Sequence, residues 1–372
     1  MKNVMIIANS RYPNGTANSI NVFRMSAAFV SKGFKVRLVA LRSSLISKER
    51  LWEEVCLRYG ARPALRGTFF WLPFARGAEP VLALLSFFFL LFKNRDTLVY
   101  TRVSYVAILA VRMGFLTVFE SHAPPKNNML QKIESSLLQS DKAFVVLISE
   151  GLRKAYEVKG LDTSHTLIAP DAGRLLRASV PQREEFQGDC KNIGYIGSLY
   201  SGRGFEIIVS VAKQMPERNF HITGDLRTLT SGSNSLPENI LLNDAVTPDQ
   251  AERMAGTFDV LLMPYQKEVR IGNELDTSLW MSPLKMFEFM LSGRPVIASD
   301  LSALREILRN SENAILVPPD DIDAWLDALR RLDSTELRYQ LAKKAYREAS
   351  ASYTWDSRVK AILNHLNSKF KG

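Results

Sequence analysis

The stretch Ser282-Pro-Leu-Lys-Met-Phe-Glu-Phe-Met-Leu-Ser-Gly-Arg-Pro295 carries the clearest structural pattern in the chain. Ser282 followed by Pro283 is typical of a helix start, because a serine oxygen accepts a free backbone N–H and a proline at the first helical position needs no donor. Gly293 is typical of a helix end. The apolar run Pro295–Ser299 that follows predicts a strand buried on both faces. We therefore expect a short helix leading into a central strand.

This helix has the features of an anion-binding element. Leu284, Phe287 and Leu291 fall on one face and are expected to pack on a core. The N-terminus carries free N–H groups and a partial positive charge, which favour a bound phosphate. Glu288 lies one and a half turns further on, where its carboxylate can accept hydrogen bonds from the hydroxyls of a ligand. The alternative is an ordinary capped helix of an α/β protein, and the stretch alone leaves both open.

Length and cysteine content limit the class of protein. A chain of 372 residues predicts two or three domains. Cys56 and Cys190 are far apart and have no metal-type spacing, so we expect neither a disulfide framework nor a zinc site, and a reducing cytoplasm is the expected setting. The first eight residues form too short an apolar run for a signal peptide and predict a buried strand.

Charge is distributed unevenly along the chain. Residues 1–180 contain 25 Lys and Arg against 12 Asp and Glu, whereas the remainder contains 23 against 26. This division indicates two domains with different partners. Nucleic acid and anionic membrane surfaces are the usual partners of a basic domain.

The alternation of strands and helices predicts parallel, doubly wound sheets. Val4–Ala8 and Lys35–Ala40 are strand-like and flank a helical pattern over Ser19–Lys32, after a polar loop over 9–18. Gly15 is the only glycine of that loop, so the GxGxxG fingerprint is absent and a nicotinamide cofactor is disfavoured. A second set of strand, loop and helix begins at Asn192.

Residues 42–95 combine arginines, aromatic residues and the apolar run Val81–Phe92. Twelve residues are too few to span a bilayer, which needs about 20. Two interpretations stay open: a buried helix of the sheet, or a basic, aromatic surface in the membrane interface. The residues expected to make that membrane or acceptor surface are Arg58, Arg62, Arg66 and Trp71.

An Asp-x-Asp pattern occurs at Asp321 and Asp323. Some metal-dependent transferases use this spacing. Here the pair follows two prolines at a helix start, where acidic residues interact favourably with the helix dipole. We interpret the pair as a helix cap, with a metal site as the alternative.

Several further motifs follow one another in a fixed order, and together they resemble the retaining glycosyltransferases of family 4, which have the GT-B fold. The resemblance covers nearly the whole chain. The motifs are Phe119–His122, Ile148–Ser149, Ala169–Asp171, Tyr195–Ser198 with Arg203 and Gly204, Ser282–Pro295, Ala298–Glu306, Asn313–Pro318 and Tyr353–Asp356.

The resemblance implies an α/β fold of GT-B architecture, in which two Rossmann-like doubly wound domains face each other across a cleft. Residues 1–176 would bind the acceptor and would be joined by a terminal helix at about 355–372. Residues 190–354 would bind the nucleotide-sugar, and a polar linker would lie between them.

The resemblance also implies the site residues. His122 would contact the donor sugar, Arg203 would neutralise the diphosphate, and Glu288 would bind the ribose hydroxyls. The further donor-binding positions are Gly15, Gly197, Ser198, Gly204, Gly224, Asp225, Val246, Ser282, Pro283, Leu284 and Lys285. Gly224, Asp225 and Val246 would lie near the base.

Two positions depart from the family pattern. Trp280 stands where many members carry a first glutamate. Two alternatives stay open: Glu274 or Asp276 takes over that role, or the sugar is held in a different way. Ser198 stands where members often have an arginine. Both departures occur at positions that family members use to bind the donor.

The function implied is a retaining, metal-independent transfer from a UDP- or GDP-linked sugar to a saccharide or lipid-linked acceptor, in the synthesis of a cell-surface polysaccharide or glycolipid. We expect no cofactor, no metal and no nucleic-acid partner, and a cytoplasmic location that includes peripheral contact with the inner, anionic membrane face. The alternatives are a nucleotide-sugar epimerase or a phosphorylase of the same fold, and a basic nucleic-acid-binding protein without enzymatic activity.

Overall fold

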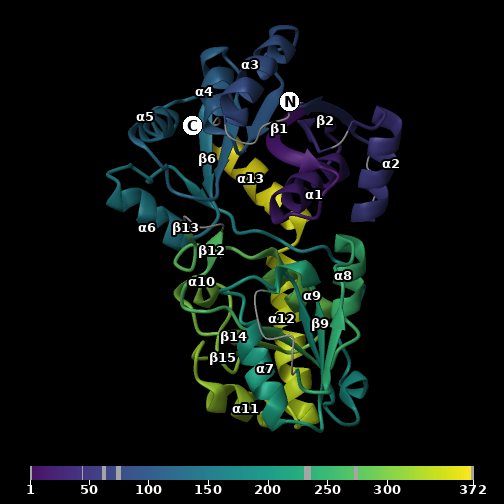
Figure 1. The fold of residues 1–372 in the computed structure, drawn as a ribbon. Coiled ribbons are helices and arrows are strands. Elements are labelled where there is room, and N and C mark those ends of the chain that lie inside the picture. Colours follow the sequence, from purple (N-terminus) through teal and green to yellow (C-terminus); the bar gives the residue numbers. More distant parts are fainter. Residues whose placement is uncertain are drawn as a thin grey trace. The chain divides into compact units, whose positions relative to one another are not determined.

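The chain forms two compact units, each built on its own parallel sheet (Figure 1). The computed structural model describes residues 2–43, 45–60, 64–72, 77–229, 236–271 and 275–369. Unit 1 comprises 1–171 and 355–372, and unit 2 comprises 172–354. The boundary lies slightly before the end expected at residue 176, and the residues expected as a linker belong to unit 2.

Unit 1 has a seven-stranded sheet in the order β3-β2-β1-β4-β5-β6-β7. All described pairings in it are parallel, and the chain reverses its direction of winding between β1 and β4. In such sheets ligands bind beyond the carboxyl ends of the strands near the reversal. Its strands are β1 (Asn3–Tyr12), β2 (Lys35–Arg42), β3 (Arg66–Trp71), β4 (Leu98–Thr101), β5 (Thr117–Ser121), β6 (Ala143–Leu147) and β7 (Leu167–Ile168).

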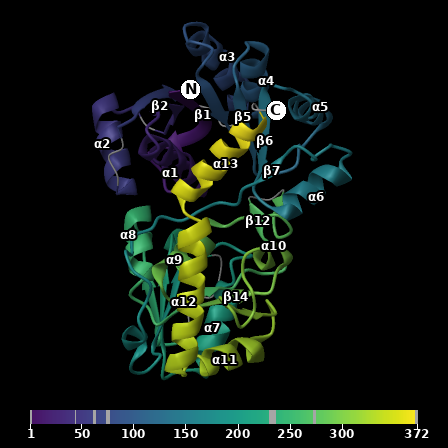
Figure 2. The same cartoon turned by 180° about the vertical axis from the view of Figure 1, so that it is seen from behind.

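Helices cover both faces of this sheet. The last helix of the chain belongs here, and it packs beside the first helix (Figure 2). A segment from the end of the sequence thereby reaches the core of the first domain. The helices are α1 (Ala17–Ser31), α2 (Lys48–Tyr59), α3 (Ala78–Leu91), α4 (Ser104–Arg112), α5 (Asn128–Leu138), α6 (Glu150–Val158) and α13 (Trp355–Lys369).

Unit 2 repeats the pattern with the strand order β10-β9-β8-β11-β14-β15 and a reversal between β8 and β11. Its strands are β8 (Asn192–Ile196), β9 (Asn219–Thr223), β10 (Ile240–Asn243), β11 (Val260–Met263), β14 (Val296–Ser299) and β15 (Ile315–Val317), with a separate antiparallel pair of β12 (Arg270–Ile271) and β13 (Leu275–Asp276). Its helices are α7 (Phe205–Gln214), α8 (Pro248–Ala255), α9 (Leu284–Ser292), α10 (Ser302–Arg305), α11 (Ile322–Arg331) and α12 (Thr335–Ser352), with 3-10 turns at Arg183–Phe186 and Leu226–Thr228.

The sheet of unit 2 separates two apolar cores. Successive residues of a strand point to opposite faces, and in β11 Val260 and Leu262 pack on one side whereas Leu261 and Met263 pack on the other. The first side is covered by α7 and α11, and the second by α9 and α12. Helix α9 is buried almost all round, because Phe287, Met290 and four other residues are inaccessible to solvent.

The helix expected from the opening motif is present, with a shifted start. Helix α9 begins at Leu284, and Pro283 is its N-cap without a side-chain hydrogen bond, so the prediction that Ser282 caps the helix was wrong. Pro283 has an extended backbone (φ −74°, ψ 128°), so the first helical residue lies one position further on. The helix ends at Gly293 in the left-handed conformation (φ 75°), as predicted.

Two further expectations change in unit 1. The prediction of a polar loop over 9–18 was partly wrong, because β1 continues to Tyr12 through a register shift after Ile7. The buried hydroxyl of Tyr12 donates to the carbonyl of Ser19, 3.0 Å away, which ties this polar extension to α1. The irregular region 42–95 supplies a regular helix, an edge strand and another helix.

Candidate nucleotide-binding site and buried carboxylate cluster

The glycine loop of unit 2 follows β8 at the reversal point of the sheet. Its backbone is held at both ends. The N–H of Gly197 donates to the carbonyl of Thr223 (2.8 Å), and the hydroxyl of Tyr195 donates to the carbonyl of Ser198 (2.5 Å). A Cβ on Gly204 would lie 1.8 Å from the carbonyl oxygen of Pro264, so only glycine fits where the loop enters α7.

Lys285 occupies the space that a side chain at position 197 would fill. A Cβ on Gly197 would lie 1.3 Å from the Lys285 Nζ, and this ammonium lies 5.0 Å from the centre of the Tyr195 ring. Burial and the nearby Arg203 lower the pKa of Lys285 to about 7. The residue therefore lies over the glycine loop and is ready to take up a proton when an anion arrives.

Arg203 lies in the same group of side chains. Its Nη2 donates to the Tyr200 hydroxyl (2.5 Å), and its guanidinium lies over the rings of Tyr200 and Tyr265 at 4.8 and 5.3 Å. Its Nε is buried and makes no hydrogen bond within the described residues. Neither Arg203 nor Lys285 forms an ion pair in the described part of the chain. Two basic side chains that form no salt bridge in the described residues and lie beside a glycine loop fit a diphosphate.

Glu288 lies one turn after Lys285 on the half-buried side of α9. It lines a polar cavity of about 250 Å³, which also takes side chains from α8 and from the segment that opens unit 2. Three arginines contribute to the lining, namely Arg174, Arg177 and Arg253. Glu288 thus lies in the middle of α9, with access to a cavity lined by charged side chains.

The positions expected near the base lie at the ends of β9 and β10. The N–H of Gly224 donates to the carbonyl of Asn243 (3.1 Å). Asp225 forms an ion pair with Arg227 (2.8 Å) and caps the 3-10 turn, so its carboxylate already has a structural partner. Val246 is half-buried directly before α8.

The residues proposed to replace the missing first glutamate differ in how they are placed. Asp276 accepts hydrogen bonds from the N–H groups of Val269 (2.9 Å) and Ser278 (3.0 Å), so it holds the turn before α9. Glu274 lies outside the described residues. Trp280 is half-buried four residues before the helix.

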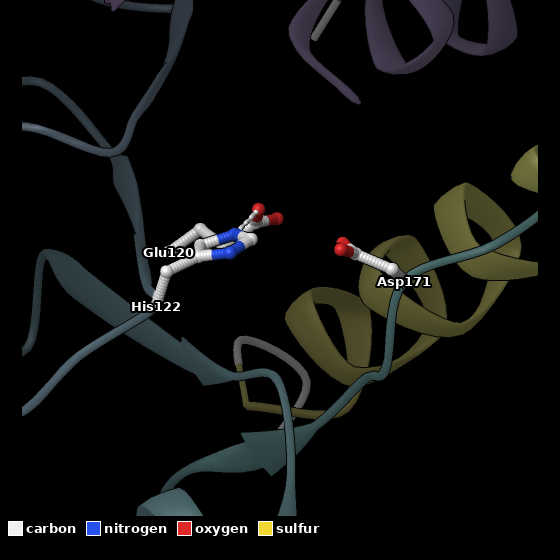
Figure 3. A group of neighbouring side chains, drawn as sticks. All are labelled: Glu120, His122 and Asp171. Carbon is white, nitrogen blue, oxygen red and sulfur yellow. Dashed lines mark hydrogen bonds and ion pairs between the residues drawn. The ribbon is translucent and has the colours of Figure 1, made fainter. Parts of the chain in front are cut away.

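His122 belongs to a cluster of charged side chains beyond β5 in unit 1. Figure 3 shows Glu120 and His122 together, with Asp171 pointing towards them from the facing segment. Glu120 is fully buried, and its Oε1 accepts a short hydrogen bond from the His122 Nε2 and lies 3.8 Å from the Arg102 Nε. The same Glu120 oxygen therefore contacts both His122 and Arg102.

Arg358 of α13 completes this cluster. Its Nη1 donates to the Glu120 Oε2 (2.7 Å), and its other nitrogens donate to the carbonyls of Ala169 (2.9 Å) and Pro170 (2.7 Å). Burial alone raises the pKa of Glu120, but Arg358, His122 and Arg102 hold that pKa well below its usual range. Sequence reasoning missed Arg358, which lies 238 positions from Glu120. The only local signal is an arginine three residues after the Tyr-Thr-Trp motif.

The cluster also has the composition of a metal site. Ligand atoms of Glu120, His122 and Asp171 lie within 4.8 Å of one another. However, Arg358, Tyr100 and His122 already occupy the oxygens of Glu120, and Asn21 donates to Asp171 (2.6 Å). The carboxylates of Glu120 and Asp171 therefore already have hydrogen-bond partners within unit 1. Burial lowers the pKa of His122, and burial raises that of Asp171.

The Asp-x-Asp pair lies in unit 2, at the start of α11. Asp321 is the N-cap, and its carboxylate accepts from the N–H of Ala324 (3.0 Å). Asp323 lies in the first helical turn. The structure thus gives this pair the capping role that its position predicts.

The structure does not bring the expected membrane or acceptor residues into one patch. Arg66 and Trp71 lie at opposite ends of β3, about 17 Å apart by the rise of a strand, and on opposite faces. Arg58 is half-buried on α2, and its Nη1 would lie 3.7 Å from a Cβ on Gly15. Arg62 lies outside the described residues. Gly15 is exposed in the loop before α1.

Comparison with known proteins identifies the second unit. Residues 190–334 match the family model described as Glycosyl transferases group 1. Over these residues the chain is similar to the group 1 glycosyl transferases. The match favours a transferase over the epimerase and phosphorylase alternatives.

Similar proteins point the same way. The chain is 24% identical to an alpha-D-kanosaminyltransferase of Streptomyces kanamyceticus over 43% of this chain and 41% of that protein. It is 40% identical to a phosphatidyl-myo-inositol mannosyltransferase of Mycobacterium leprae, over 21% of each chain. The matched stretches thus span less than half of these curated relatives.

Solved structures establish the fold over the whole chain. S. aureus TarM, in a complex with fondaparinux, alpha-GlcNAc-glycerol and UDP, superposes with a TM-score of 0.73 at 12% identity, covering 99% of this chain and 100% of that one. The chain has the GT-B fold, as the sequence predicts.

Proposed function

We propose that this chain is a retaining glycosyltransferase that transfers a sugar from a UDP- or GDP-linked donor to a saccharide or lipid-linked acceptor, in the synthesis of a cell-surface polysaccharide or glycolipid. The observation that carries this proposal is the Lys285 ammonium over Gly197, beside Arg203. The family match of residues 190–334 and a structural neighbour solved with UDP support it.

The chemistry follows from the charge that develops on the leaving group. Transfer breaks the bond between the anomeric carbon and the diphosphate, and negative charge grows on the departing oxygen. Arg203, Lys285 and the free N–H groups at the start of α9 supply preorganised positive charge for it. This stabilisation requires no metal ion, and attack by the acceptor on the face of the departing diphosphate requires no protein nucleophile.

The remaining site residues have binding roles in this proposal. Glu288 accepts hydrogen bonds from the ribose hydroxyls, and Gly224 and Val246 border the base. His122 contacts the sugar, and Glu120 fixes the orientation of its ring through the hydrogen bond to Nε2. Arg358 acts through Glu120 and is a positioning residue.

The first experiment measures donor binding. UDP and GDP are titrated into the full chain by calorimetry, and Glu288→Ala is compared with Asp327→Ala, which removes an exposed carboxylate of α11. Loss of hydrogen bonds to a charged group predicts a fall in affinity of about 10- to 100-fold for Glu288→Ala alone. Unchanged affinity in Glu288→Ala would contradict the proposal. Anomeric proton couplings of the product, measured by NMR, distinguish retention from inversion.

A further inference from the structure

Helix α3 of unit 1 buries one face and exposes another that is equally apolar. Ala78, Leu82 and Leu90 belong to the core. On the other face Leu84 is 60% exposed and Phe88 is 56% exposed, and Phe92 directly after the helix is 86% exposed. Leu91, at 44%, lies on the same face. A spacing of three or four residues places these side chains next to one another. The sequence left open whether this helix is buried or lies at a surface, and the structure shows one buried face and one exposed face.

A groove runs along this face between α3 and α4, which lie side by side (Figures 1 and 2). Its volume is about 490 Å³, and apolar side chains of both helices line it, including Leu84, Phe87, Ile108 and Leu109. Arg112 is the one charged side chain among the described residues of the lining. An exposed apolar surface of this kind marks an interaction site.

Cations lie around the apolar face. Arg112 is exposed at the end of α4, Arg95 lies 4.3 Å from the centre of the Phe115 ring, and Lys93 follows Phe92. Between residues 77 and 112 the acidic residues of the sequence are Glu79 and Asp96. Glu79 accepts a hydrogen bond from Asn9 (2.8 Å). Unit 1 as a whole contains 27 Lys and Arg against 13 Asp and Glu. The surroundings of the groove therefore complement a negatively charged partner.

We propose that the α3–α4 face, defined by Leu84, Phe88, Leu91, Phe92 and the groove beside them, docks on an anionic lipid bilayer. The apolar side chains would enter the boundary between headgroups and acyl chains, and Arg112, Arg95 and Lys93 would meet the lipid phosphates. Among the described residues no helix is long and apolar enough to cross a membrane, so this contact is peripheral. The inference does not depend on the transfer reaction.

The test measures partition of the full chain onto vesicles of phosphatidylglycerol with phosphatidylcholine, and onto phosphatidylcholine alone. The double variant Leu84→Asp/Phe88→Asp is expected to lower the partition coefficient on the order of 100-fold, because two large apolar side chains leave the bilayer. Arg112→Glu is expected to weaken binding to the anionic vesicles by about fivefold or more and to leave binding to neutral vesicles unchanged. Thermal unfolding should stay at the wild-type temperature, since all three positions are exposed.

Two matched controls separate this face from other exposed apolar residues. Val158→Asp changes a side chain that is 88% exposed at the end of α6, and it should leave partition unchanged. Leu57→Asp with Arg66→Glu tests the surface that the sequence suggests, since Leu57 is 70% exposed on α2. Loss of binding in that pair with normal binding in Leu84→Asp/Phe88→Asp would overturn the proposal. A wild-type dimer that this double variant dissociates, with unchanged vesicle binding, would overturn it as well.

Discussion

The sheets of the two units wind in the same way. The charged side chains at the ends of their strands differ, however, in whether they form ion pairs within the protein. In unit 1 the Glu120 carboxylate is buried and already bonded to Arg358, His122 and Tyr100. In unit 2 Lys285 and Arg203 form no ion pair within the described residues. Removing one partner of a buried ion pair destabilises a domain, whereas basic side chains at a glycine loop are available to a bound anion. The comparison predicts that similar substitutions affect folding in one unit and ligand binding in the other.

The largest expected effect is on the stability of unit 1. Arg358→Met removes the partner of a fully buried carboxylate and should lower the free energy of unfolding by about 3–5 kcal/mol. Denaturation by urea measures this change. Lys360→Met removes an exposed cation from the same helix and should have almost no effect. If Arg358→Met cost less than about 1 kcal/mol, Glu120 would not depend on Arg358.

The next effect concerns ligand binding by unit 2. Arg203→Met removes charge-assisted hydrogen bonds to a diphosphate and should weaken UDP binding by about 10- to 100-fold. Stability should be unchanged or slightly higher, because the substitution also removes repulsion with Lys285. Calorimetry and urea denaturation of the same variant give both quantities. A large loss of stability without a loss of affinity would remove the contrast between the two units.

A smaller effect is a dependence of UDP affinity on pH. The free protein has a pKa of about 7 at Lys285, and a bound diphosphate must raise it, so the complex binds more protons than the free protein above pH 7. Affinity should be fully developed below this pKa and should fall by up to about tenfold per unit as the pH rises above it. Measurements from about pH 7.5 upward avoid the titration of the phosphate itself, whose pKa is about 6.

The matched variant for this pH dependence is Lys285→Arg. Arginine stays protonated throughout the range, so the affinity of the variant should be independent of pH. An equal slope in the wild type and in Lys285→Arg would show that another group takes up the proton.

The smallest expected effect comes from the Asp-x-Asp pair. Asp321→Ala removes the N-cap of α11 and should lower the free energy of unfolding by about 1 kcal/mol. Binding of UDP should be unchanged, with or without a chelator. A loss of UDP binding that magnesium restores would indicate that the pair holds a metal ion.

The parts of the molecule predicted well from sequence depend on local patterns. The helix ending at Gly293 and the loop at Gly197 are set by residues a few positions apart, whose backbone preferences act locally. The start of α9 was misplaced by one residue, because Ser282 and Pro283 are both compatible with the N-cap position. The order in which strands and helices follow one another along the chain was enough to predict the two sheets.

The parts that sequence could not predict depend on distant contacts. Arg358 reaches Glu120 only because α13 folds back onto unit 1, and no spacing near either residue reveals this. The apolar run of α3 indicates a helix but not which of its faces is covered. Arg66 and Trp71 are close in sequence, yet strand alternation places them on opposite faces of β3.

The most direct test of the contrast between the units is hydrogen–deuterium exchange of the full chain with and without UDP. Binding should slow exchange of the backbone N–H groups in 197–204 and 284–288, where the glycine loop and the start of α9 lie. Exchange at 119–122 and around residue 171 should be unchanged, because the cluster of unit 1 is already satisfied. Protection confined to unit 1, or none at the glycine loop when UDP is bound, would contradict the account.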